Sequence, residues 1–319
     1  MDRSGRAHGR SLTLASGPHH PMVADLLART GFPAAGNPVT CAVSGGPDSL
    51  ALLVLAVAAG CPATAVHVDH GLRPGSAGEA DVVAEVAGSL GAAFRSVRVE
   101  VADGPNLEAR ARAARFGALP AGVLTGHTAD DRAETVLLHL LRGAGPAGAV
   151  GMARSPSRPL LDLRRTETVA LCAALDLEPV DDPSNRDARF RRNRVRHELL
   201  PLLADIGDRD PVPVLVRQAD LFALVDEALA AQAATIDPTS AAELAAAPEA
   251  VAGAAVRAWL VAVGVGEGYG VDAASVGRVL DVARGAHVAT EVAGGWRVSR
   301  SGGRLSVRPP GAWQDAAHD

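Results

Sequence analysis

The sequence predicts an α/β fold, with a parallel sheet between helices followed by a smaller, mainly helical domain. Three observations support this prediction. Short β-branched runs alternate with helix-length apolar segments between residues 39 and 141, an alternation typical of a parallel sheet with helices on both faces. From about residue 209 the pattern changes to long Ala- and Leu-rich helical segments. A chain of 319 residues is also long enough for about two domains.

Strands and helices of the first domain are expected in alternating order. The expected strands span 39–43, 64–68, 94–99 and 122–126, and the expected helices span 49–59, 79–90, 106–119, 129–141 and 166–175. Proteins with such sheets bind their ligands beyond the carboxyl ends of the strands. The polar residues that follow the first, second and fourth strands are therefore the candidate functional residues.

The last third of the chain is expected to be helical, with a small sheet at its end. Helical patterns cover 214–234, 241–263 and 272–283, and alternating patterns at 287–292, 296–299 and 304–307 indicate an antiparallel sheet. We therefore predict a disordered tail over 1–21, a catalytic domain over 22–208 and a mainly helical domain over 209–319.

Composition excludes several classes of protein. The net charge is −5 and aromatic residues make up 3% of the chain, so neither a global basic field nor broad aromatic stacking is available for binding nucleic acid. Cys41, Cys61 and Cys172 are isolated, which argues against a disulfide framework or a cysteine metal cluster. No apolar run reaches the length of a membrane span. We expect a cytoplasmic protein with no membrane contact.

The loop after the first strand predicts a phosphate site. Ser-Gly-Gly-Pro-Asp-Ser over Ser44–Ser49 passes from a β-branched run directly into a helix. Glycines let backbone N–H groups approach an anion, and the helix N-terminus adds partial positive charge. The loop differs from the common G-x-x-x-x-G-K-S/T type, and the chain contains no Lys. A simple turn with an Asp or Ser cap would explain the glycines, but not both hydroxyls and the acid together.

The second loop and the helix expected after it carry further polar residues. His67 begins the sequence His-Val-Asp-His-Gly-Leu-Arg, for which a polar turn is an equally good interpretation and a zinc site a weak one. Glu108, Arg112 and Arg115 share one face of the expected 106–119 helix. A salt-bridge ladder is the simpler interpretation of that face. Beside a phosphate loop, however, its arginines would bind phosphate groups in a bidentate manner.

The third loop and a later arginine run complete the candidate site. His127, Asp131 and Glu134 lie on one side of the expected 129–141 helix. Acids near a helix N-terminus are common because of the helix dipole. Three acids, Asp130, Asp131 and Glu134, together with a histidine favour binding of Mg²⁺ or of an ammonium substrate. The arginine run over 186–196 is either a solvated face or, as we prefer in an acidic chain, a contact for nucleic-acid phosphates.

Five motifs in order resemble those of the tRNA(Ile)-lysidine synthases. They are Ser-Gly-Gly-Pro-Asp-Ser, His-Val-Asp-His-Gly-Leu-Arg, Asn-Leu-Glu-Ala-Arg-Ala-Arg-Ala-Ala-Arg, Gly-His-Thr-Ala-Asp-Asp-Arg-Ala-Glu-Thr, and Asp-Asp-Pro-Ser-Asn followed by the arginine run. The likeness covers about 39–201. It implies a Rossmann-like PP-loop ATP-pyrophosphatase domain followed by a helical tRNA-binding domain. The chain resembles the compact members, which lack a full additional C-terminal domain.

The resemblance implies a reaction with ATP, Mg²⁺, L-lysine and tRNA(Ile) with a CAU anticodon. The C2 oxygen of the wobble cytidine, position 34, attacks the α-phosphate of ATP, and the lysine ε-amine then displaces AMP to form lysidine. Codon specificity changes from AUG to AUA. Three alternatives stay open: a related tRNA thiolase, an ammonia-using synthetase and a non-catalytic RNA-binding protein. The scattered cysteines argue against the thiolase, and the lack of a glutaminase-like domain argues against the synthetase. Oligomeric state is not predicted, and a homodimer stays open.

By the same resemblance, each group of residues receives an expected role. The ATP-binding residues are Ser44, Gly45, Gly46, Pro47, Asp48, Ser49, His67 and Arg115. Catalysis is expected of Asp48, Arg112, His127, Asp131 and Glu134. Asp48 is also the expected Mg²⁺ contact, and Asp131 and Glu134 are the expected lysine-binding acids. The expected tRNA contacts are Arg189, Arg191, Arg192, Arg194 and Arg196.

Overall fold

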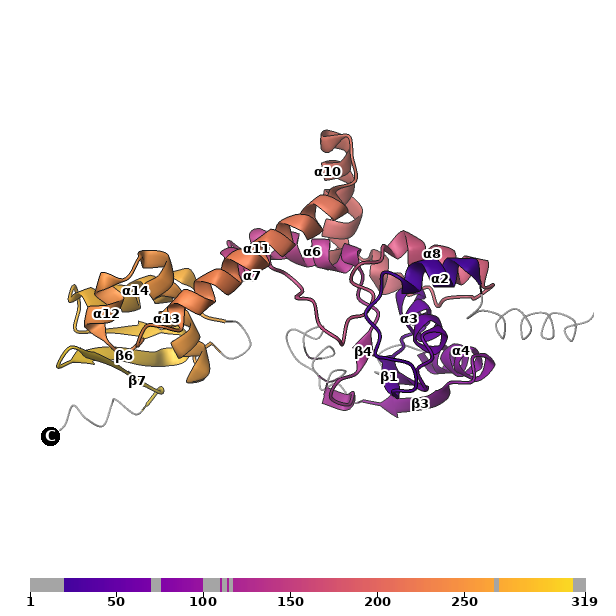
Figure 1. Ribbon diagram of the computed structural model, residues 1–319, viewed down its shortest axis with the longest axis horizontal. Helices are drawn as coiled ribbons and strands as arrows, with labels where there is room; N and C mark the ends of the chain where they lie inside the picture. The colour runs from indigo at the N-terminus through magenta and orange to yellow at the C-terminus, as the bar shows by residue number, and fades with distance from the viewer. Residues whose placement is uncertain are drawn as a thin grey trace, which may run out of the picture. The chain divides into compact units, whose positions relative to one another are not determined.

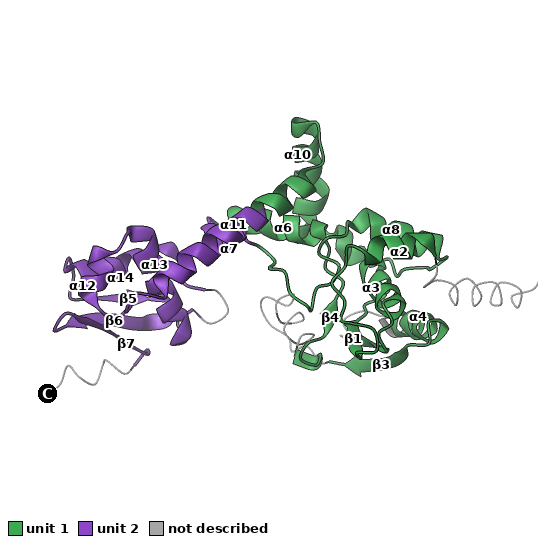
Figure 2. Cartoon of the chain, in the orientation of Figure 1, with its two compact units in different colours: residues 1–142, 151–218 green, residues 143–150, 219–319 purple. Residues whose placement is uncertain are grey.

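A computed structural model describes residues 20–69, 76–99, 110, 114, 117–266 and 270–311. The chain forms a larger compact unit, residues 1–142 and 151–218, and a smaller one, residues 143–150 and 219–319 (Figure 2). The expected tail, the motif residues after Asp69, and Arg112 and Arg115 lie outside the described residues. The functional domain boundary near residue 208 stays a prediction.

A four-stranded parallel sheet forms the centre of the larger unit (Figure 1). Its strands are β1 (Val39–Ala42), β2 (Ala63–Asp69), β3 (Ala93–Arg98) and β4 (Leu124–Thr125), in the order β3-β2-β1-β4. The predicted parallel sheet is thus confirmed. Successive strands lie on one side of β1, whereas β4 lies on the other side. Such a reversal opens a crevice at the carboxyl ends of the strands, where ligands of this fold class bind.

Helices cover one face of this sheet, and a smaller apolar cluster lies on the other face. Helix α3 (Pro47–Ala58) is apolar all round and buried from Ser49 to Ala56, because it packs on the sheet and also against α8 (Arg165–Ala174). Helices α2 (Pro21–Leu27) and α4 (Ser76–Ser89) also pack against α3. On the opposite face, Val66 packs with Leu119 and Val123.

A helical segment that the sequence did not predict covers residues 191–207. It consists of α9 (Arg191–Arg194), a π-helical turn η3 (Val195–Leu199) and α10 (Leu200–Gly207), and it follows the 3-10 turn η2 (Pro183–Arg186). Val195 and Leu200 pack against Ala133 and Leu137 of α6 (Ala129–Leu140). The π turn shifts the helical period, so the apolar residues of this stretch show no regular spacing in the sequence.

The smaller unit is a helical layer on a three-stranded antiparallel sheet. Its elements are α7 (Pro146–Ala149), the end of α11 (Pro211–Ala233), α12 (Ala241–Ala246), α13 (Glu249–Ala262), α14 (Ala273–Arg284), β5 (Ala289–Val292), the turn η4 (Ala293–Gly295), β6 (Trp296–Ser301) and β7 (Arg304–Arg308). The small antiparallel sheet expected at the end of the chain is confirmed. The single helix expected over 241–263 is wrong: Ala247 and Pro248 are extended and divide it, since proline has no N–H to donate. None of the described helices is both long and apolar enough to span a membrane.

Candidate active site

The loop between β1 and α3 leaves backbone donors free at the sheet edge. The Ser44 N–H donates to the Ser49 hydroxyl at 3.2 Å, and that hydroxyl donates to the Gly46 carbonyl at 2.8 Å. The loop is therefore closed by its own side chains. Gly45 has a φ of +88°, and a Cβ there would lie 2.8 Å from the side chain of Val180. Among the described residues, nothing accepts a hydrogen bond from the N–H groups of Gly45 and Gly46, which suits an anion.

The third loop lies directly against the first turn of α3. A Cβ at Gly126 would come within 2.6 Å of the Asp48 carbonyl oxygen, so only glycine permits this approach. His127 follows, and its Nδ1 lies 2.8 Å from the Thr125 hydroxyl. Thr128 caps α6: its N–H donates to Asp131 at 2.9 Å. The structure thus brings the first and third predicted loops together.

Asp48 lies at the start of α3 and faces α8. Its Oδ1 accepts a hydrogen bond from the Thr168 hydroxyl, and its Oδ2 accepts one from Arg165 Nε at 3.1 Å. Burial raises the pKa of Asp48 above its usual value, although Arg165 and Thr168 act in the opposite direction. This carboxylate is therefore held in place at an energetic cost, which is typical of functional groups.

Arg165 joins the three acids of the site. Its guanidinium contacts Asp48 as described, donates from Nη2 to Asp131 Oδ1 at 2.8 Å, and donates from Nη1 to Glu134 Oε1 at 3.0 Å. Its side chain is only 21% exposed. A planar group with five donors is suited to such a multiple contact. Arg165 thus connects α3, α6 and α8 at the mouth of the crevice.

Glu134 is fully buried and surrounded by arginines. Besides Arg165, its carboxylate accepts from Arg192 Nε at 2.9 Å and from Arg196 Nε at 2.7 Å. Arg196 also lies 3.6 Å from Asp131. Both oxygens of Glu134 are therefore occupied by guanidinium groups.

The arginine run predicted to contact RNA is divided by these contacts. Arg192 and Arg196 turn inward to the acids, whereas Arg189, Arg191 and Arg194 are exposed. Arg189 pairs with Asp187 and Arg194 with Glu198. The run is thus divided into an inward and an outward group, and its contact with RNA stays a prediction.

His67, the other candidate histidine, belongs to β2 and is buried. It is 2% exposed, and its Nδ1 lies 3.0 Å from the Val43 carbonyl, to which it can donate. Its Nε2 is buried without a hydrogen-bond partner among the described residues. A buried ring nitrogen of this kind indicates a missing polar partner at the site.

The sequence analysis missed Arg165, Thr168 and the pair Asp130–Arg164. Asp130 accepts from Arg164 Nε at 3.0 Å and from the Arg165 N–H at 2.8 Å, and thereby fixes the start of α8 beside α6. The only sequence signal was a pair of arginines at the start of a helix whose third residue is Glu167. That pattern is also typical of an ordinary exposed helix start.

The pKa of Asp131 predicts a loss of stability in acid. Burial alone would raise this pKa, but Arg165, the Thr128 N–H, Arg192 and His127 lower it from 3.8 to about 2. A depressed pKa stabilises the fold above pH 4, and this stabilisation, about 2 kcal/mol, is lost as the pH falls from 4 towards 2. We expect the free energy of unfolding in urea to fall less steeply over this range in Asp131→Asn than in the wild type. The exposed acid Asp162, changed to Asn, is the control; an equal slope in all three proteins would contradict the prediction.

The described part of the site offers a metal ion one carboxylate and no complete set of protein ligands. No group of three or more His, Cys, Asp or Glu side chains among the described residues is placed to hold a metal ion. Mg²⁺ commonly uses one or two carboxylates together with substrate phosphates and water. The Asp48 carboxylate, beside a loop with free N–H groups, fits that mode of binding.

The chain is similar in sequence to known proteins. Residues 22–203 match the family described as PP-loop domain. The chain is 45% identical over 246 residues to a tRNA(Ile)-lysidine synthase of Nocardia farcinica, with 72% of this chain and 77% of the relative covered. It is 42% identical over 307 residues to one of Salinispora tropica, with 86% and 92% covered. A U34-tRNA thiolase, NcsA from Methanococcus maripaludis, solved with its 4Fe-4S cluster, superposes with a TM-score of 0.49 and 17% identity, over 66% of this chain and 80% of that chain.

Proposed function

The chain belongs to the tRNA(Ile)-lysidine synthase family, and we propose that it is the ATP-dependent ligase that joins lysine to C2 of the wobble cytidine in tRNA(Ile) with a CAU anticodon. The observation that carries the proposal is the junction, through Arg165, of Asp48 in the phosphate loop with Asp131 and Glu134. It places an anion site beside two buried carboxylates. A reaction between a triphosphate and an amine needs both.

The phosphate loop is proposed to bind ATP for the first step. The free N–H groups of Gly45 and Gly46, with the hydroxyls of Ser44 and Ser49, are suited to phosphate oxygens. The cytidine C2 oxygen attacks the α-phosphate, the bond to the β-phosphate breaks, and pyrophosphate leaves. Asp48 would contact Mg²⁺, which neutralises the phosphate charge when it is bound. His67 Nε2 is available to a polar group of the nucleotide.

The acids are proposed to bind lysine for the second step. A lysine ε-ammonium has a pKa of about 10.4 and must lose a proton before it attacks. The amine then bonds to C2 of the cytidine and AMP leaves. Asp131 lies beside His127. The carboxylate, whose pKa is low, can orient the ammonium as an anion, and the imidazole can accept the proton. Glu134 has no free oxygen, so an ammonium reaches it only by replacing one of the guanidinium groups.

The outward arginines are the proposed contacts for the anticodon arm. Arg189, Arg191 and Arg194 are exposed and project from the same stretch of chain whose Arg192 and Arg196 reach the acids. A base that reacts must leave its stack. Phosphate contacts close to the acids would hold the loop while the cytidine enters. Dimer formation remains a proposal without a specific contact.

The test is a ligation assay with labelled lysine, ATP and Mg²⁺. We expect CAU-anticodon tRNA(Ile) to become labelled, with one AMP and one pyrophosphate formed per lysine joined. The same tRNA with a GAU anticodon is the control and should stay unlabelled. Pyrophosphate release without labelled RNA would overturn the proposal. Incorporation of sulfur instead would favour a thiolase. The burial of all three cysteines argues against that alternative function.

A further inference from the structure

The two acids proposed to bind lysine contact more guanidinium groups than they can neutralise. In the described part of the chain, Glu134 is contacted by three arginines, which are Arg165, Arg192 and Arg196. Asp131 lies 2.8 Å from the first of them and 3.6 Å from the last. Two negative charges therefore face three positive ones, and the side-chain ammonium of lysine would add a fourth.

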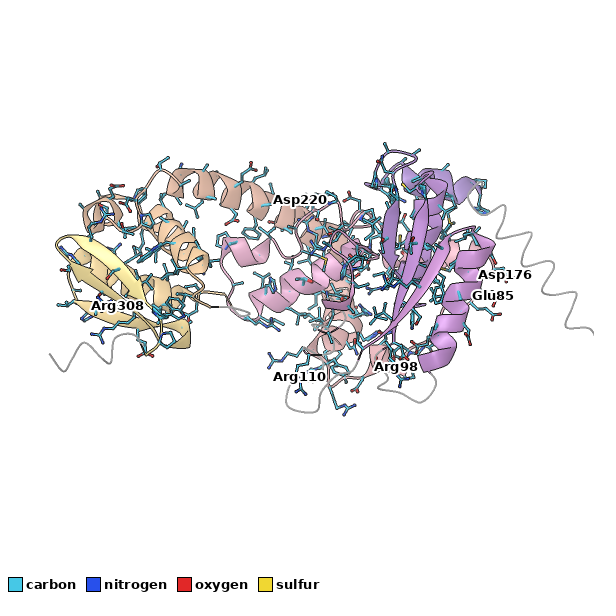
Figure 3. The ribbon with its side chains drawn as sticks, turned by 90° about the horizontal axis from the view of Figure 1, so that it is seen from below. Glu85, Arg98, Arg110, Asp176, Asp220 and Arg308 are labelled. Carbon is cyan, nitrogen blue, oxygen red and sulfur yellow. The ribbon has the colours of Figure 1, made fainter. Side chains whose placement is uncertain are left out.

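Burial makes this excess of positive charge effective. Charged side chains at the surface of the same unit, such as Glu85 of α4 and Arg98 of β3 in Figure 3, are exposed and are screened by water and salt. Glu134 is fully buried, and the side chains of the three arginines are between 21% and 29% exposed. Partly buried charges are screened much less than exposed ones. An added cation therefore meets strong repulsion at this pair of acids.

Arg165 is the one arginine of the three that also contacts Asp48. Its Nε donates to Asp48 Oδ2 at 3.1 Å, whereas the other two arginines reach the acids from α9 and η3. Asp48 belongs to the first turn of α3 and directly follows the loop whose Gly45 and Gly46 N–H groups suit an anion. Arg165 therefore lies between the phosphate loop and the two acids.

A triphosphate at the loop competes with the acids for the Arg165 guanidinium. Guanidinium groups bind phosphate oxygens in a bidentate manner, with charge-assisted hydrogen bonds. A triphosphate also carries more negative charge than either acid. The proposed function puts its phosphates at the loop that precedes Asp48, which Arg165 Nε already contacts. Binding of the triphosphate therefore favours transfer of the guanidinium from the acids to the phosphates.

The departure of Arg165 leaves an open acceptor on Asp131. Oδ1 of Asp131 accepts a hydrogen bond from Arg165 Nη2 at 2.8 Å, whereas Oδ2 accepts one from the Thr128 N–H at 2.9 Å. Glu134 keeps its other two arginines, so two acids then face two guanidinium groups. The excess of positive charge is removed, and Oδ1 can accept a hydrogen bond from an ammonium.

We propose that Arg165 closes the lysine site in the free protein and opens it when ATP binds. The guanidinium moves from Asp131 and Glu134 to the phosphates of ATP, and the lysine ε-ammonium takes the acceptor that it leaves. The inference rests on the proposed function, because that function supplies both ligands. ATP and lysine therefore raise each other's affinity, and thermodynamic linkage requires that they do so by the same factor.

The first experiment measures the binding of L-lysine to the wild type by calorimetry, without RNA. The nucleotide is α,β-methylene-ATP with Mg²⁺, because this analogue cannot be cleaved between its α- and β-phosphates. We expect the analogue to lower the dissociation constant of lysine about 10-fold, and lysine to lower that of the analogue equally. Norleucine lacks the ε-ammonium, so its binding should not respond to the analogue. Adenosine lacks the phosphates, so it should leave lysine binding unchanged.

Arg165→Gln should bind lysine more tightly than the wild type when no nucleotide is present. Without this guanidinium the acids carry no excess of positive charge, so we expect binding about 10-fold tighter and little further effect of the analogue. A purely structural role of Arg165 predicts the opposite, a weaker lysine site. Arg29→Gln is the matched control, because Arg29 contacts Glu167 of the same helix α8 and should leave the wild-type coupling unchanged.

Urea unfolding shows whether each variant is folded under the conditions of the binding measurement. If Arg165→Gln is unfolded, Arg165→Lys takes its place. A lysine at this position keeps one positive charge but contacts fewer acids at once, so it should show the same two changes to a smaller extent.

The outcomes separate this inference from the proposed function. If lysine binds the wild type equally well with and without the analogue while the ligation assay forms lysidine, Arg165 does not control the site and the function stands. Coupling that persists unchanged in the Arg165 variant, or that adenosine alone produces, would also overturn the inference, as would the absence of lysine binding in every state. If the coupling is found but no lysidine forms, the proposed function is wrong and the linkage between the anion and ammonium sites stands.

Discussion

Arg165→Met is expected to lower the free energy of unfolding by about 3–5 kcal/mol at pH 7 and to abolish pyrophosphate release. The guanidinium contacts Asp48, Asp131 and Glu134. Its removal takes the arginine partner from the largely buried Asp48 and leaves Asp131 and Glu134 to Arg192 and Arg196. Methionine fills a similar volume, so the loss is chiefly electrostatic. Urea unfolding and a pyrophosphate assay measure the two effects. Without Arg165, the pKa of Asp48, already raised by burial, rises further.

Two comparisons make this expectation specific to the site. Arg154→Met removes an exposed pair with Asp162, in which both side chains are about half exposed, and should change stability by less than 1 kcal/mol. Arg165→Lys keeps one positive charge and should recover part of the stability but little activity, since a point charge cannot meet three carboxylates at once. Lowering the pH should reduce the difference in the free energy of unfolding between wild type and Arg165→Met, because protonated acids need no cation. A difference that persists at pH 2 would show that the loss of packing, and not of charge, destabilises the variant.

The fold was largely predictable because its signals are local. The run Leu50–Ala56 is buried throughout and reads as continuous apolar sequence, and in the strand Val39–Ala42 the buried residues Val39 and Cys41 are also apolar. The break at Ala247 and Pro248 was not predicted, although the proline is a direct local signal for it. The helical segment over 191–207 could not be predicted, because the π turn and the series of arginines leave its buried residues without a regular apolar spacing.

The candidate site was predictable only where one segment carries it. The phosphate loop is a single continuous motif, so its residues could be named from the sequence. Arg165 lies 117 residues from Asp48, and nothing local distinguishes it from other arginines. Likewise, Arg192 and Arg196 belong to a run that looks exposed, and only the packing of α9 and η3 on α6 turns them towards Glu134. Long-range ion pairs of this kind follow from topology, which the sequence pattern does not contain.

Asp48→Asn is expected to abolish pyrophosphate release without loss of stability. Because burial raises the pKa of Asp48, its ionised form disfavours folding at neutral pH, and the neutral amide removes that cost. The amide also finds partners. Its oxygen can accept from Arg165 Nε, and its NH₂ can donate to the Thr168 hydroxyl, which in turn lies 2.8 Å from the Arg165 carbonyl.

Stability and activity should therefore change in opposite ways at Asp48 and together at Arg165. An amide cannot supply the negative charge that a Mg²⁺–ATP complex requires, so pyrophosphate release should fall at least about 1,000-fold, equivalent to about 4 kcal/mol in the barrier. The urea midpoint at pH 7 should equal or exceed that of the wild type. A stable variant with near-normal pyrophosphate release would show that Asp48 only organises the loop. A strongly destabilised variant would show instead that the negative charge of Asp48 is needed to hold Arg165. The main role of the acids would then be to stabilise the fold.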